Sequence, residues 1–336
     1  QFLKRTFYSA AGMPLVHHLG RPWRGRACVI CYHRILPDDE FEADKSPNYN
    51  LIMPTSKFAE QMEFLSENHE VVSMDGLVDY LESEPDRDAN KFVVAVTFDD
   101  GYKDNLTHAL PILEQYNIPA TIYITTRFPE GDTWMWWYEI WDYLKTIECL
   151  KISYPKKNFK LEARTLKQKI HCFEHLRIWM MTLSYKEQKK AIEVLTDKTT
   201  REQYPHLCLN WDEIKILDQH PLVTIGAHTN SHPNLKKLTE QEAFSEMSDS
   251  KNLLEDKLKH SVVHFAYPFG TPNEADVREF ELASRCGFRT AVTTRPETIR
   301  STPLHAIPRL VVPSFLSLHG FKGKLSGWEH LGRRFV

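Results

Sequence analysis

The chain has 336 residues and a formal net charge of −3, with 42% hydrophobic and 26% charged residues. These proportions are those of a folded globular protein, and they exclude a disordered, fibrous or collagen-like chain. The small net charge gives no reason to expect nucleic acid as a partner. No run of about 18 apolar residues occurs, so the sequence predicts no transmembrane segment.

Short apolar segments of β-type composition recur along the chain and predict strands. They are residues 27–32, 92–98, 119–124, 222–226, 262–266, 288–293 and 307–312. Amphipathic segments separate most of them: one follows Ser56, one follows Asp104, and one begins at Thr239 with a capping box. Strands that alternate with helices predict a parallel sheet with crossover helices, either open or closed into a barrel.

Residues 127–206 interrupt this alternation. Several helical patterns occur there, among them 163–180 and 185–197, without a convincing strand, so we predict a helical insertion. Residues 151–201 contain thirteen Lys and Arg against five Asp and Glu. This surplus is typical of a solvated helical surface, but it would also suit an acidic glycan or peripheral contact with an anionic membrane.

The other segments complete the predicted organisation. Residues 27–126 and 207–312 form one domain, residues 1–26 an N-terminal extension and residues 313–336 a C-terminal tail. The first twenty residues lack the apolar stretch of a signal peptide. We expect a cytoplasmic protein that could lie at the face of the inner membrane. The alternative is a periplasmic protein whose leader has been removed. The sequence predicts no oligomeric state.

Cysteine spacing suggests one further hypothesis. The six cysteines are Cys28, Cys31, Cys149, Cys172, Cys208 and Cys286. Cys28 and Cys31 form a CxxC, a spacing found in metal and redox sites. In a strand, however, residues three apart lie on opposite faces. We therefore interpret all six as buried thiols in a reducing compartment.

The strongest chemical signal is Phe98-Asp99-Asp100-Gly101, which ends a predicted strand. Active sites of parallel α/β folds lie at this end of the strands. Because adjacent residues point in different directions, one carboxylate can bind a divalent cation while the other takes a proton from water held on the same ion. A helix-capping Asp-Asp-Gly turn is the structural alternative.

Two further motifs follow later predicted strands. His228 and His232 are four apart, which would bring both imidazoles to one side of a helical turn and suit zinc-like metals. With Asp100 they would give two nitrogens and one carboxylate, a set that leaves positions open for water and substrate. The turn Tyr267-Pro268-Phe269-Gly270 could present an amide N–H to a developing oxyanion.

In this order and spacing, the motifs resemble those of the NodB-homology polysaccharide deacetylases, carbohydrate esterase family four. The resemblance covers about residues 27–125 and 207–312. It implies a distorted (β/α) barrel of about seven parallel strands that hydrolyses an acetamido group on a sugar with the help of a metal. Zinc suits the ligands best, and cobalt, nickel and iron are the alternatives.

The resemblance also implies a role for each motif residue. Asp99 looks like the general base that activates a metal-bound water, and the Phe269 amide looks like an oxyanion donor. The residues that look like the metal ligands are Asp100, His228 and His232.

The chain departs from the family pattern at two points. Many members carry an arginine where this chain has Ala266, so we expect Asp99 to take another partner, with Arg309 as the candidate and a surface cation as the alternative for Arg309. The family's late histidine, a general acid, also lacks an evident counterpart. His33 is similar to an active-site histidine of deacetylases of bacterial exopolysaccharides such as poly-N-acetylglucosamine. His33 and His305 are therefore the candidates to protonate the leaving amine.

Aromatic residues are candidates for contact with the sugar. Trp134, Trp136, Trp137 and Trp141 cluster where the insertion begins. Aromatic faces pack against sugar rings, and we predict substrate contacts for Trp137 and Tyr267. The i, i+4 spacing of Trp137 and Trp141 favours packing in a helix core equally well.

The sequence therefore predicts a metal-dependent hydrolase that removes N-acetyl groups from a bacterial surface polysaccharide or its lipid-linked precursor. Two alternatives stay open. One is a glycan-binding protein on the same barrel whose catalysis has decayed. The other is a deacylase of an O-acetyl, formyl or cyclic amide group.

Overall fold

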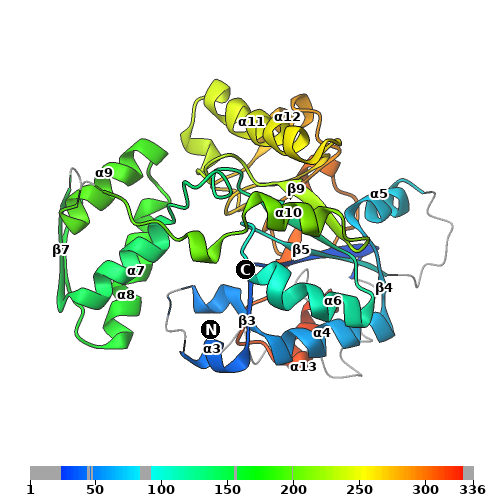
Figure 1. The fold of residues 1–336 in the computed structure, drawn as a ribbon, viewed down its shortest axis with the longest axis horizontal. Coiled ribbons are helices and arrows are strands. Elements are labelled where there is room, and N and C mark those ends of the chain that lie inside the picture. The colour runs from blue at the N-terminus through cyan, green and yellow to red at the C-terminus, as the bar shows by residue number, and fades with distance from the viewer. Residues whose placement is uncertain are drawn as a thin grey trace.

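The computed structural model describes residues 24–43, 46, 48–83, 92–154, 157–198 and 200–327. Its centre is a parallel sheet (Figure 1), whose strands follow the order β11-β10-β9-β6-β5-β1-β12. The strands are β1 (Ala27–Tyr32), β5 (Val93–Phe98), β6 (Ala120–Ile124), β9 (Val223–Ala227), β10 (His264–Ala266), β11 (Thr290–Val292) and β12 (Arg309–Val311). A short strand, β4 (Glu70–Val71), pairs with the start of β5.

The two outer strands of this order nearly meet. Val292 of β11 forms a parallel bridge with Ile307, two residues before β12 begins. The Thr293 amide also donates to the Ile307 carbonyl at 2.8 Å. The sheet therefore curves into a nearly closed barrel of seven parallel strands, which confirms the predicted fold class.

Helices pack around the barrel, most of them through one large apolar cluster, whereas α5 packs through Met74 and Leu77 on a smaller cluster that includes Val29 and Ala95. They are α4 (Thr55–Asn68), α5 (Met74–Glu82), α6 (Leu110–Tyr116), α10 (Trp211–Asp218), α11 (Glu240–Leu258), α12 (Val277–Arg285) and α13 (Leu318–Leu325). The helix predicted after Asp104 starts with a π-helical turn, Asn105–Ala109, and the Thr239 capping box opens α11 as predicted. Short elements lie before α4: β2 (Arg34–Leu36), α3 (Asp38–Ala43) and β3 (Ile52–Pro54).

The insertion lies beside the barrel and has an apolar core of its own (Figure 1). Its elements are α7 (Trp136–Thr146), β7 (Cys149–Tyr154), β8 (Lys157–Glu162), α8 (Leu166–Met180) and α9 (Tyr185–Thr196). The predicted helices are present, but the prediction that this segment holds no strand is wrong. β7 and β8 form an antiparallel hairpin in which apolar residues alternate with exposed ones, a short pattern that the surrounding helical periodicity masked.

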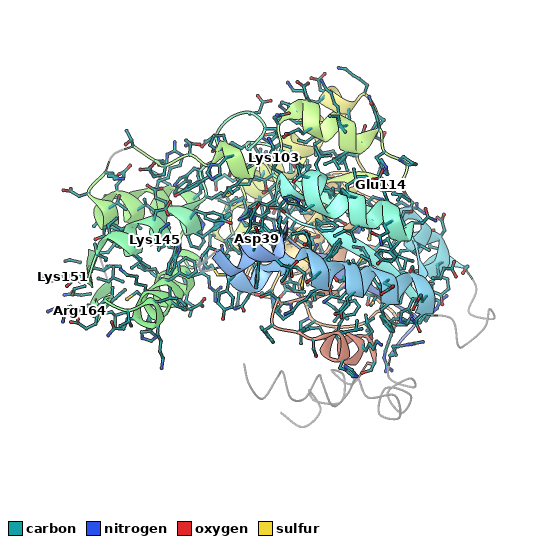
Figure 2. All side chains as sticks on the ribbon, turned by 60° about the horizontal axis from the view of Figure 1, so that its bottom comes forward. Asp39, Lys103, Glu114, Lys145, Lys151 and Arg164 are labelled. Atoms are coloured by element: carbon teal, nitrogen blue, oxygen red, sulfur yellow. The ribbon has the colours of Figure 1, made fainter. Side chains whose placement is uncertain are left out.

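Several basic residues of the insertion lie away from the barrel. Lys145, Lys151 and Arg164 are found at this remote end (Figure 2). Lys151 and Lys160 stand directly opposite each other on the exposed face of the hairpin. These lysines of the hairpin therefore face solvent, whereas Arg177 of α8 lines the cavity at the barrel.

Both ends of the chain lie partly outside the described residues. The described residues do not include residues 1–23 of the predicted N-terminal extension or residues 328–336 of the tail. The rest of the tail contains α13, whose Phe321 and Leu325 are buried in the main core. Within the described part of the chain, no helix combines the length and the apolar character needed to cross a membrane.

The cysteines are all free, but they are not all buried. Cys28 and Cys31 lie on opposite faces of β1: Cys28 belongs to the outer core, and Cys31 faces Asp99. Cys149 and Cys286 are only half-buried, which corrects the prediction that all six are buried. Cys149 opens a hairpin strand and Cys286 ends a helix, so both lie at the margin of a core.

Candidate active site

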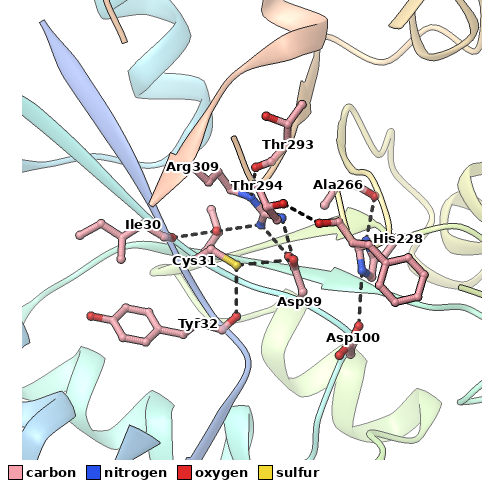
Figure 3. A network of polar contacts seen from close by, with 12 residues as sticks. Ile30, Cys31, Tyr32, Asp99, Asp100, His228, Ala266, Thr293, Thr294 and Arg309 are labelled. Atoms are coloured by element: carbon pink, nitrogen blue, oxygen red, sulfur yellow. Dashed lines mark hydrogen bonds and ion pairs between the residues drawn. The ribbon is translucent and has the colours of Figure 1, made fainter. Parts of the chain in front are cut away.

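Two adjacent carboxylates leave the barrel rim in different directions. β5 ends at Phe98, and the next turn holds Asp100 at φ +76° and Gly101 at φ +74°. The left-handed backbone at Gly101 favours glycine; an added Cβ would lie 2.9 Å from the terminal methyl of Ile124, which a side-chain movement can relieve, so conformation matters here more than space. The left-handed turn directs Asp99 toward the barrel interior and Asp100 toward the loop after β9 (Figure 3).

Asp99 is paired with Arg309, the partner that the sequence analysis proposed. Arg309 Nη1 and Nη2 each lie 2.6 Å from an oxygen of Asp99, and the guanidinium is fully buried. Arg309 also donates to the Thr293 carbonyl (Figure 3) and to Thr97 Oγ1, and these contacts fix the plane of the guanidinium. The alternative interpretation, an ordinary surface cation, is therefore wrong.

This pairing decides the charge of Asp99. Burial alone would raise the pKa of the carboxyl, but the Arg309 guanidinium more than offsets burial and holds the pKa below its ordinary value. Asp99 is thus ionised at neutral pH and can accept a proton.

Asp100, His228 and His232 form a second group, separate from the ion pair. Asp100 Oδ1 lies 3.4 Å from His228 Nε2 and 3.3 Å from His232 Nε2. Atoms bonded at about 2.0–2.1 Å to one tetrahedral ion stand about 3.3–3.4 Å apart. Asp100 Oδ1 is buried without a hydrogen-bond partner in the described part of the chain. The spacing, the donor types and the unpaired oxygen all fit a zinc-like divalent cation.

The segment that carries the two histidines is not helical. His228 follows β9 directly, and the chain then passes through left-handed conformations at Thr229 (φ +63°) and His232 (φ +56°). The Thr229 hydroxyl accepts from the His232 amide at 3.0 Å, which stabilises the turn. The predicted helical turn is therefore wrong, although the two imidazoles converge as that prediction required.

The turn after β10 brings a backbone donor to the same place. Phe269 and Gly270 have φ values of +61° and +66°, and the Gly270 carbonyl accepts from the Thr294 amide. A Cβ on Gly270 would lie 2.7 Å from the Thr294 nitrogen. Among the described residues, no acceptor takes the Phe269 N–H. This N–H is therefore free to donate to a substrate oxygen.

A cavity of about 230 Å³ unites these groups. It is lined by residues of the barrel and of the insertion, among them Asp99, Asp100, His228, His232, Phe269, Trp136 and Trp137. Phe269 and Trp137 both contact the His232 ring. The cavity therefore contains a carboxylate base, a set of potential metal ligands and an unpaired N–H donor.

The cavity distinguishes between the two candidate proton donors. His33 lines it, is half-buried, and has an Nδ1 without a partner in the described structure. Burial lowers the pKa of His33, and the nearby carboxylates oppose this only in part. His305 instead directs its Nε2 to the Phe288 carbonyl at 2.7 Å and does not line the cavity. Only His33 is placed to exchange a proton with a bound substrate.

The structure places Trp137 at the cavity but not Tyr267. Trp137 and its neighbour Trp136 line the cavity, whereas Trp134 donates to Glu139 and Trp141 packs on Phe173 inside the insertion. Tyr267, predicted to contact substrate, does not line the cavity. It is fully buried, and its hydroxyl donates to the His305 carbonyl at 2.9 Å. Tyr267 stands two residues after Phe265, so its side chain points to the same outer side of the barrel and packs in the main core.

The family model of the polysaccharide deacetylases matches residues 86–291, more than half of the chain. The chain belongs to the polysaccharide deacetylase family. This deacetylase is 22% identical over 294 residues to YxkH of Bacillus subtilis (strain 168), which is also assigned to the polysaccharide deacetylases, covering 87% of this chain and 74% of that protein.

Solved structures share the fold of the deacetylase. Deacetylase PplD of Streptococcus pyogenes, in complex with acetate, matches with a TM-score of 0.59 and 19% identity, over 89% of this chain and 98% of PplD. IcaB of Ammonifex degensii matches with a TM-score of 0.56 and 17% identity, over 90% of this chain and 97% of IcaB.

The sequence analysis missed a buried ion pair at the cavity wall. Arg34 Nε lies 2.8 Å from Asp104 Oδ2, and Arg34 Nη1 donates to the Tyr138 hydroxyl at 3.2 Å. Asp104 also accepts from the Ile35 amide. The pair thus connects the barrel rim of the deacetylase to α7 of the insertion. Its only sequence signals were that Arg34 directly follows His33 and that Asp104 stands four residues after Asp100, before a predicted helix.

Proposed function

We propose that the deacetylase hydrolyses the acetamido group of an N-acetylated sugar in a bacterial surface polysaccharide or its lipid-linked precursor, with a divalent cation held by Asp100, His228 and His232. The observation that carries this proposal is the ionised Asp99 beside an open three-ligand set in one cavity. Zinc is the cation we propose first, because two imidazoles and one carboxylate suit it.

The chain's own groups account for each proton and charge in the reaction. Asp99, oriented by Arg309, accepts the proton that a water molecule loses as it attacks the acetamido carbonyl carbon. The free Phe269 N–H donates to the oxygen of the tetrahedral centre that forms. As the C–N bond breaks, the departing amine needs the proton that Asp99 accepted from water. His33 lies on the cavity wall with a ring nitrogen within 4.8 Å of the Asp99 carboxylate, and as a neutral imidazole it would relay this proton to the amine, so that acetate and a free amino sugar result. A bound cation would add Lewis-acid polarisation of the carbonyl and acidify water.

The pairing of Asp99 with Arg309 argues against a decayed glycan-binding protein. The family arginine absent at Ala266 is replaced in function by a guanidinium from β12 that reaches the same carboxylate. The pair would also stabilise an inactive chain, but the buried Asp100 oxygen beside it has no hydrogen-bond partner in the described residues, and a chain that had lost catalysis would gain stability by losing that oxygen.

The decisive experiment measures acetate release from N-acetylglucosamine oligosaccharides and from matched O-acetylated sugars. We expect release from the N-acetyl substrates, its loss with EDTA and its recovery with zinc or cobalt. Asp99→Asn should lower the rate by at least about 100-fold while cation binding is kept, because the base is removed and the ligands are not. Asp100→Asn should weaken cation binding itself.

Three results would overturn parts of the proposal. Absence of acetate release from every N-acetyl sugar with zinc, cobalt and nickel added would contradict the N-deacetylase activity. Glycan binding without hydrolysis would favour the decayed binding protein. Faster hydrolysis of the O-acetyl substrates would favour an esterase on the same site.

A further inference from the structure

The two imidazoles of the proposed cation site are held in different ways. His228 Nδ1 lies 2.8 Å from the Ala266 carbonyl, so this nitrogen donates and leaves Nε2 facing Asp100 (Figure 3). His232 Nδ1 is buried and has no hydrogen-bond partner within the described ranges. Metal-binding histidines almost always anchor their second nitrogen on an acceptor, which fixes the orientation of the ring. His232 lacks that anchor and needs another one.

Aromatic rings surround His232 instead. The Phe269 ring lies 4.8 Å from the His232 ring, nearly perpendicular to it, and the Trp137 ring lies 5.2 Å away at an interplanar angle of 59°. His228 approaches at 5.0 Å. The Phe269 and His228 rings meet the His232 ring edge to face, and the Trp137 ring is tilted against it; ring contacts of this kind are attractive and directional. Such contacts can restrict rotation of the imidazole.

Trp137 is the only one of these rings that comes from the insertion. It lies in the first turn of α7 and is only 7% exposed. Trp136 packs against it edge to face at 5.4 Å, and the next residue, Tyr138, receives the hydrogen bond from Arg34 at the barrel rim. The indole is thus held by the core of the insertion on one side and by the barrel on the other.

We propose that Trp137 is a positioning residue for His232, and that the insertion thereby sets how tightly the deacetylase binds its cation. The inference rests on the proposed function, because it takes Asp100, His228 and His232 as ligands. It assigns the insertion a role in assembling the site of the barrel, beyond forming a wall of the cavity. It also gives Trp137 an effect that is measurable without substrate.

The test compares Trp137 with Trp141, one turn further along the same helix. Trp141 is equally buried but packs on Phe173, away from the histidines. The variants are Trp137→Phe, Trp137→Ala and Trp141→Ala in the full chain. Zinc affinity is measured by competition with a chromophoric chelator, and the ligand geometry by the visible absorption spectrum of the cobalt-loaded protein. Circular dichroism and thermal melting report the fold.

We expect Trp137→Ala to weaken zinc binding by about tenfold or more, as loss of an orienting contact does in other metal sites, and to alter the cobalt spectrum. Trp137→Phe should keep most of the affinity because an aromatic ring remains. Trp141→Ala should lower thermal stability and leave zinc affinity unchanged. If Trp137→Ala fails to fold, Trp137→Phe and Trp137→Leu show whether zinc affinity needs an aromatic ring at this position or only a large apolar side chain.

Wild-type zinc affinity and cobalt spectrum in a folded Trp137→Ala protein, or in Trp137→Leu where alanine does not fold, would overturn the inference. An equal loss of affinity in Trp141→Ala would do the same, because it would show a general effect of insertion stability. The proposed function fails differently: wild-type protein would then bind zinc no better than Asp100→Asn. Binding that depends on Asp100 but not on Trp137 would refute only the role of Trp137.

Discussion

Asp99 and Arg309 are 210 positions apart in the chain, and their side chains form a two-point ion pair with both contacts at 2.6 Å. Arg309 lies on β12, whose neighbour β1 separates it from β5. Its side chain runs through the barrel interior to the carboxyl end of β5, past the Tyr123 ring. A planar guanidinium matches both carboxylate oxygens at once, which a lysine cannot do.

Removal of the Arg309 charge should destabilise the protein as well as inactivate it. Arg309→Met leaves Asp99 buried and unpaired, and we expect a loss of about 3–5 kcal/mol in the free energy of unfolding. Urea denaturation measures this loss. The double variant Asp99→Asn/Arg309→Met should recover much of it, because the isolated charge is gone. A double variant no more stable than Arg309→Met would contradict the unpaired-charge explanation.

Gly270 should be required for the turn that presents the Phe269 N–H. In Gly270→Ala the new Cβ would meet the Thr294 nitrogen, so the turn must shift and the turnover number should fall. Gly287→Ala is the matched control, since Gly287 has a similar φ of +74° with open space around it. The control should lose about 1–2 kcal/mol of stability from its left-handed backbone and keep its activity. Acetate release and urea denaturation of both variants test this.

His33 and His305 should differ sharply as proton donors. His33→Gln should lower the turnover number by about 100-fold or more, because general acid catalysis contributes about that much, while the fold is kept. His305→Gln removes a contact to the Phe288 carbonyl outside the cavity and should affect stability alone. Steady-state kinetics of acetate release separate the two. Equal activity of His33→Gln and wild type would assign the proton to another group.

Stability should depend on pH through His260 and Asp218. The hydrogen bond to Asp218, at 2.9 Å, raises the pKa of His260 above its ordinary value of 6.5. The contribution is therefore complete below pH 6.5 and is lost as the pH rises through the raised pKa of the folded state. The His260 side chain is 49% exposed, so solvent screening limits the effect to about 1 kcal/mol or less.

The measurement is the free energy of unfolding of wild type and Asp218→Asn at pH 6 and at pH 9. We expect the variant to be less stable at pH 6 and the difference to shrink at pH 9. A difference that is the same at both pH values would show that the charge of His260 has no part in it.

The sequence by itself determined the elements of the barrel and the identity of its chemical groups. Apolar strand segments and amphipathic helices are local patterns. The glycine after Asp99-Asp100 marks a turn and so places this motif at the end of a strand. Arg309 was predicted as the partner of Asp99 through the resemblance to the deacetylase family, because the arginine that many members carry is absent at Ala266. What the local patterns hid was the β7–β8 hairpin, which is too short to stand out among helical periodicities.

Only the tertiary structure decided which aromatic and polar groups share the cavity. Tyr267 and His305 turn away from it, whereas Trp137 reaches across from the insertion to the His232 ring. These outcomes depend on the angle at which the insertion packs on the barrel and on left-handed turns at Asp100, Thr229 and Phe269. Both are set by contacts between segments far apart in the chain, and no local spacing encodes such contacts.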